Sequence, residues 1–124
     1  MTEMMRGHEM MAEITPEMRE CIANCQECHA VCLETTVHCL QMGGQHAEAG
    51  HIRTLLDCAE ICQTSANYML RSSPLHHLTC GVCAEACTRC AASCEAFGDD
   101  RMMQSCAEVC RRCAESCERM ARSA

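Results

Sequence analysis

Sixteen cysteines carry the chemistry that this sequence offers, and most of them are spaced three or four residues apart. Reduced sulfur is a soft ligand, and soft thiolates select Cu(I), zinc or iron–sulfur clusters. We therefore expect a protein that holds many soft metal ions, with Cu(I) as the leading hypothesis. The candidate ligands are Cys21, Cys25, Cys28, Cys32, Cys39, Cys58, Cys62, Cys80, Cys83, Cys87, Cys90, Cys94, Cys106, Cys110, Cys113 and Cys117.

The spacing of these cysteines is that of one face of a helix in a bundle. From Cys80 to Cys94 they step by three, four, three and four residues, and from Cys106 to Cys117 by four, three and four. That pattern marks the seam along which helices pack around a common axis. Thiols thus occupy the positions where Leu and Ile usually lie. At 1.5 Å per residue, the sulfur column from Cys80 to Cys94 is about 21 Å long.

The elements that must position this seam can be read from helix start and stop signals. Thr15-Pro16 is a typical start, and Gly43-Gly44 a typical end. Short connections make each helix antiparallel to the one before it. We predict an all-α fold, an antiparallel up-down-up-down four-helix bundle with a thiol-lined core, and no strand. The predicted parts are a Met/His-rich arm over 1–15 and the bundle over 16–124, with helices at about 16–42, 46–71, 74–97 and 100–121.

Alternating helix directions also predict which cysteines meet across the core. Thr35 and Ser65 fill seam positions without sulfur, and we expect their hydroxyls to bond to carbonyls of their own helices. The predicted layers are Cys39/Cys94/Cys106, Cys58/Cys90/Cys110, Cys32/Cys62/Cys87/Cys113, Cys28/Cys83/Cys117 and Cys25/Cys80, with Cys21 last.

Composition excludes several classes of partner. The chain has 124 residues, enough for one domain, and Leu, Ile, Val and Phe together make up only 16 of them, so the thiols must form much of the core. There is no lysine, and ten arginines face seventeen acidic residues, which argues against nucleic acid as a partner. Neither a secretory signal nor a membrane span is recognisable. We expect a cytoplasmic protein, where thiols stay reduced and metal binding is favoured over disulfides.

Other uses of sulfur fit the pattern less well. Iron–sulfur and structural zinc sites use loop-borne spacings that wrap four sulfurs around one centre, and these cysteines lie within long helices. A general soft-metal buffer with zinc, similar in role to metallothionein, remains the alternative. An enzyme is not expected, because the C-x-x-C pairs lie mid-helix rather than at a helix start. Charge neutrality favours about one Cu(I) per thiolate, roughly sixteen per chain.

Two surfaces complete the prediction. The first is the bundle end that holds the first and third connections, where thioether and imidazole groups could pass copper inward. The opposite end is the alternative mouth, because it also carries Met and His side chains: Met18, Met69, His76, His77 and Met120. The second is an apolar stripe on the first two helices, for which we weigh a wider core-facing strip and a face for association equally. The candidates for the copper-admitting mouth are Met42, His46, His51, Met102 and Met103.

In its cysteine runs, the chain resembles the cytosolic bacterial copper storage proteins. The resemblance covers about residues 16 to 122 and rests on CIANCQECHAVC at 21–32, CGVCAEACTRCAASC at 80–94 and CAEVCRRCAESC at 106–117. It implies a four-helix bundle with many Cu(I) ions on core thiolates, assembly as a homotetramer, and copper entering at a bundle end that bears Met or His. The sixteen cysteines named above are the ligands that the resemblance implies.

Overall fold

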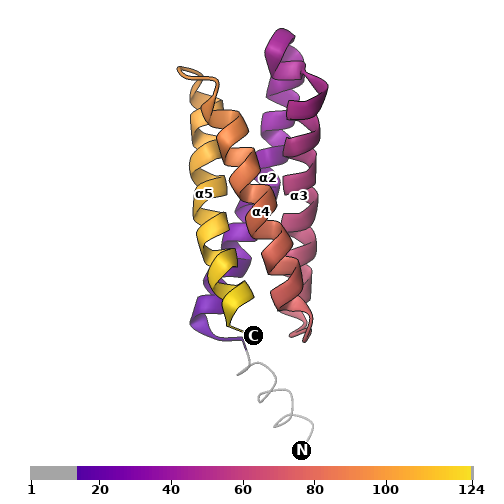
Figure 1. Cartoon of the computed structure of the whole chain (residues 1–124), viewed down its shortest axis with the longest axis vertical. Helices are drawn as coiled ribbons and strands as arrows, with labels where there is room; N and C mark the ends of the chain where they lie inside the picture. The colour runs from indigo at the N-terminus through magenta and orange to yellow at the C-terminus, as the bar shows by residue number, and fades with distance from the viewer. Residues whose placement is uncertain (1–13, 124) are drawn as a thin grey trace, which may run out of the picture.

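The computed structural model describes residues 14–123 of the chain, and these residues fold into four long helices and one short one (Figure 1). Helix α2 spans Pro16–Met42, and the 3-10 helix η1 spans Gly44–Ala47. The remaining helices are α3 at Ala49–Leu70, α4 at His76–Glu95 and α5 at Arg101–Arg122. The Met/His-rich arm predicted over 1–15 lies almost entirely outside the described residues.

The helices form an all-α, antiparallel four-helix bundle, which confirms the predicted fold class. Each helix packs against the next one along the chain, and α5 closes the bundle by packing against α2. Figure 1 shows the four rods side by side, with α2 and α3 joined at one end and α3 and α4 joined at the other. No strand occurs in the described part of the chain, and none of its helices is long and apolar enough to span a bilayer.

Capping residues explain where the helices begin. The Thr15 hydroxyl accepts the backbone N–H of Met18 at 3.1 Å, and Pro16 supplies a first helical residue that needs no partner. Asp100 caps α5 through Oδ1, which accepts the N–H groups of Met102 and Met103. Helix α3 begins at Ala49, later than the sequence suggested, because η1 and its cap Glu48 occupy the preceding residues.

The predicted layers are wrong in the register of α2. Cys28, not Cys32, joins the cluster of Cys62, Cys87 and Cys113, and the other α2 cysteines are displaced in the same direction. This shift of α2 arises from the connection between α2 and α3. The predicted pairing of Cys32 with Cys62 puts residue 47 midway between the two cysteines. In the structure, the midpoint between Cys28 and Cys62, and between Cys39 and His51, is residue 45, inside η1.

The core consists mainly of sulfur. All sixteen cysteines have 0% of their surface exposed, and larger side chains such as Leu55, Met69 and Met103 are equally buried. Small alanines fill gaps between the seams.

The apolar stripe predicted on α2 and α3 is not simply part of the core, because several of its residues stay exposed. These are Leu33, Val37, Leu40, Leu56 and Leu70.

Candidate metal centre

The sixteen cysteines are all free, buried thiols, and the sulfur atoms of fourteen of them form a column of overlapping clusters inside the bundle. Neighbouring Sγ atoms lie 3.6 to 4.0 Å apart, both along one helix and between helices. With metal–sulfur bonds of about 2.3 Å, two sulfurs on one tetrahedral ion lie about 3.8 Å apart. The thiols are therefore already at the separation that shared coordination of an ion requires.

The thiols fall into clusters that overlap. Within each cluster, the sulfur atoms all lie within 4.8 Å of one another, and consecutive clusters share at least one cysteine. The clusters include Cys21/Cys80/Cys117, Cys25/Cys83/Cys113/Cys117, Cys28/Cys62/Cys87/Cys113, Cys28/Cys32/Cys58/Cys110 and Cys32/Cys90/Cys106/Cys110. Separate tetrahedral sites would compete for the shared thiols, whereas thiolates that bridge two ions can serve adjacent clusters together. The arrangement therefore fits a bridged array of ions of low coordination number.

At the end of the bundle near η1, the column meets imidazole and thioether ligands. Cys39 Sγ lies 3.3 Å from Nε2 of His51 and 3.6 Å from Sδ of Met103. The other ring nitrogen of His51 is 2.6 Å from the hydroxyl of Ser93 on α4, which fixes the orientation of the ring. Burial, and then the nearby His46, lower the pKa of His51, which favours the neutral imidazole that metals bind.

The structure separates the five mouth candidates into two groups. His51 and Met103 are buried beside Cys39, and His46 lies next to them, with its ring centroid 4.2 Å from that of Phe97. Met42 and Met102 are exposed at the same end. Sequence reasoning missed Ser93, whose position next to His51 depends on how α4 packs against α3 and leaves no mark in the cysteine period.

The two seam hydroxyls do not behave as predicted. The Ser65 hydroxyl contacts Cys80 Sγ at 3.3 Å and the Thr79 hydroxyl at 3.4 Å, rather than a carbonyl of its own helix. Thr35 is fully buried, and its hydroxyl is the one buried side-chain oxygen or nitrogen in residues 14–123 without a hydrogen-bond partner. The hydroxyl of the neighbouring Thr36, for which no bond was predicted, donates to the Cys32 carbonyl at 2.7 Å. The contacts of Ser65 and Thr35 differ from the prediction because they depend on which groups of the other helices lie opposite each hydroxyl.

The pKa values of the buried thiols are shifted in both directions: hydrogen bonds from Cys117 and Cys25 lower the pKa of Cys21, whereas other thiols have raised values. Burial, and then the negative charge of Asp100, raise the pKa of Cys39 to about 11. The neighbouring Cys106 and Cys90 thiols, and then burial, raise the pKa of Cys94. A low-dielectric interior disfavours isolated thiolates, so a thiolate in this core needs a nearby thiol donor or a metal ion to offset its charge. Each thiol that binds a metal ion as a thiolate must first release its proton.

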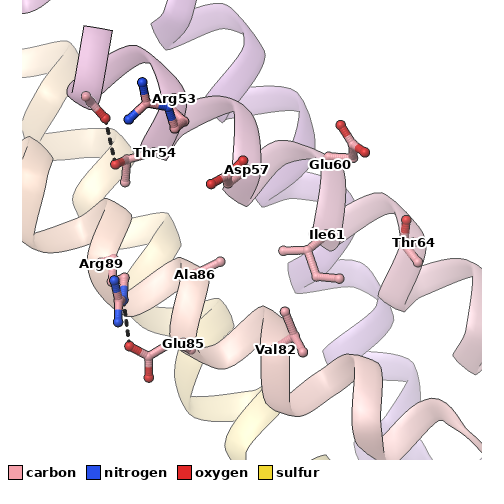
Figure 2. A pocket seen from close by; sticks show the side chains of 11 residues that line it. Arg53, Thr54, Asp57, Glu60, Ile61, Thr64, Val82, Glu85, Ala86 and Arg89 are labelled. Carbon is pink, nitrogen blue, oxygen red and sulfur yellow. Dashed lines mark hydrogen bonds and ion pairs between the residues drawn. The ribbon is translucent and has the colours of Figure 1, made fainter. Parts of the chain in front are cut away.

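A surface groove lies away from this column. It has a volume of about 590 Å³ and lies between α3 and α4 (Figure 2). Its charged side chains have both signs, and Arg89 is already paired with Glu85 at 2.7 Å. No cysteine lines this groove.

Comparison with known families agrees with this geometry. The sequence model of a family described as "Copper storage protein" matches residues 14–122. The chain belongs to the copper storage protein family. The description of this family is one of storage rather than catalysis.

Individual relatives share the fold and much of the sequence. A crystal structure of the Nmul_A1745 protein from Nitrosospira multiformis is 46% identical, with a TM-score of 0.82, over 87% of this chain and 97% of that one. The Cu(I)-bound copper storage protein BsCsp3 is 34% identical, with a TM-score of 0.78, over 85% and 98% of the two chains. The cysteine-rich protein YhjQ of Bacillus subtilis is 36% identical over 60% of this chain and 68% of its own length.

Proposed function

We propose that this protein stores Cu(I) in the cytoplasm, with the thiolates of all sixteen core cysteines as ligands and about one ion per cysteine. The observation that carries the proposal is the overlap of the thiol clusters, in which one cysteine belongs to two neighbouring groups. Bridging thiolates with two or three sulfurs per ion suit Cu(I), whereas zinc prefers four ligands of its own. The Cu(I)-bound state of the similar BsCsp3 supports the same choice.

The energetics of the core favour a neutral copper–thiolate array. A buried column disfavours net charge, and one Cu(I) per thiolate keeps the column neutral after the thiol protons leave. A divalent ion on four thiolates would instead leave a net negative charge in a buried site, which costs free energy. Loading therefore releases about one proton per thiolate formed, and copper affinity falls as the pH is lowered.

Copper enters, in this proposal, at the end of the bundle near η1. His51 and Met103 contact the outermost thiol, Cys39, so an ion bound there is already next to the column. Exposed Met42 and Met102, together with His46, would deliver copper to this position. Replacing Met103 with Leu should slow loading without changing capacity, and the matched replacement of buried Met69 at the other end should leave the loading rate unchanged.

The exposed stripe on α2 and α3 supports assembly into a homotetramer. Leu40 and Val37 on α2 have 57% and 55% of their surface exposed. The stripe continues with exposed Leu33 on α2 and exposed Leu56 on α3. An apolar strip that the monomer leaves uncovered is typical of an interface between copies. Sedimentation of the apoprotein should show a tetramer, which Leu40→Glu should dissociate. A wild-type chain that sediments as a monomer at every concentration would remove this part of the proposal.

The decisive test is an anaerobic titration of the reduced protein with Cu(I), followed by X-ray absorption. We expect saturation near sixteen equivalents and an absorption spectrum dominated by sulfur neighbours at two or three per ion. Cys28→Ser, which alters a thiol shared by two clusters, should lower the capacity by at least one ion. Thr36→Val, which changes only a nearby hydroxyl, is the matched control. Saturation near four equivalents, or displacement of copper by zinc, would instead support the zinc buffer.

A further inference from the structure

Two histidines and a carboxylate converge on one point at the η1 end, outside the thiol column. Nε2 of His38 on α2 lies 2.9 Å from Oδ2 of Asp100, and Nε2 of His46 in η1 lies 3.0 Å from the same oxygen. The three residues come from three different elements. Their side chains are 22%, 17% and 16% exposed, so they are held in place and still reachable from solvent.

Each of the three side chains is fixed by contacts of its own. Asp100 uses its other oxygen, Oδ1, to cap α5, so the carboxylate cannot rotate freely and Oδ2 stays directed at the histidines. The ring of His46 packs against Phe97, with centroids 4.2 Å apart, and lies edge-on to the ring of His38 at 5.8 Å. The group is therefore organised before any ligand arrives, which lowers the cost of binding one.

We propose that His38, His46 and Asp100 form a separate site for one divalent ion of the Zn²⁺ class. Two imidazoles and one carboxylate, with no sulfur, suit borderline divalent ions, and a fourth position open to water completes a tetrahedron. Ligand atoms at 2.0–2.1 Å from such an ion lie about 3.4 Å apart. The observed separations of 2.9 and 3.0 Å need to open by only a few tenths of an ångström once the ion replaces the shared protons.

This site is chemically distinct from the column, so it can be tested independently of copper storage. The probe is Zn²⁺ alone, added to the full chain whose thiols have first been saturated with Cu(I) under anaerobic conditions. Calorimetry should show one equivalent of Zn²⁺ bound. A parallel titration with Co²⁺ should give a d–d spectrum without thiolate-to-cobalt charge transfer. If copper loading itself fails, the difference between the Co²⁺ spectra of the wild-type apoprotein and of Asp100→Asn still separates the nitrogen and oxygen ligands from the thiolates.

Two variants and one control make the assignment specific. Asp100→Asn keeps a good helix cap, so the fold is preserved while a charged ligand is lost. His46→Gln keeps a hydrogen-bond donor in η1. Each should weaken Zn²⁺ binding at least tenfold, whereas His77→Gln at the opposite end should leave it unchanged. The proposal is overturned if the copper-loaded wild type binds no Zn²⁺, or if both variants bind it as the wild type does.

Discussion

Replacing Thr35 with Val should make the copper-free protein more stable. The Thr35 hydroxyl is fully buried and has no hydrogen-bond partner, so folding removes it from water without compensation. An unsatisfied buried polar group of this kind costs about 1–3 kcal/mol. Valine has nearly the same shape and the same branching at Cβ, so it fills the space without that penalty. We therefore expect the free energy of unfolding of Thr35→Val to rise by about 1–3 kcal/mol.

The assay is urea unfolding of the reduced apoprotein, with thermal unfolding as a second measurement. The midpoint should rise with an unchanged slope, and the melting temperature should rise by about 3–5 °C for each kcal/mol gained. Thr36→Val is the matched control, because the Thr36 hydroxyl donates to the Cys32 carbonyl at 2.7 Å. Its loss should cost about 0.5–1.5 kcal/mol. The reasoning is refuted if Thr35→Val lowers the midpoint as Thr36→Val does.

Two further predictions concern pH. Burial raises the pKa of Cys39 from 9.0 to about 11, so its contribution to stability is present below pH 9 and is lost as the pH rises through 11. The urea midpoint of the apoprotein should fall over this range, and less steeply in Cys39→Ser; equal slopes would contradict the assignment. The hydrogen bond from His38, with smaller contributions from His46 and the Met103 amide, lowers the pKa of Asp100 from 3.8 to about 2 against the opposing effect of burial. The stability difference between wild type and Asp100→Asn should therefore be constant above about pH 4 and shrink as the pH falls towards 2; a difference that persists unchanged at pH 2 would show that the carboxylate charge contributes nothing.

Local sequence signals were sufficient for the fold and for the content of the core. A period of three and four residues places every seam side chain on one face of its helix, whatever the neighbouring helices do. For that reason all sixteen thiols could be assigned to the interior, and all sixteen are buried. Thr15-Pro16 was legible as a helix start because a cap depends only on residues within one turn of it.

The position of one helix along another was decided only by the tertiary structure. Sliding α2 along its neighbours by one seam position, three or four residues, keeps every thiol inward. The spacing of the cysteines therefore cannot distinguish whether Cys28 or Cys32 meets Cys62. The backbone of η1 makes that choice by setting the centre of the hairpin. The same holds for contacts between elements distant in sequence, such as Ser93 with His51 and the meeting of His38 and His46 at Asp100. Periodicity determines which way a side chain faces, whereas packing and connection geometry determine what it meets.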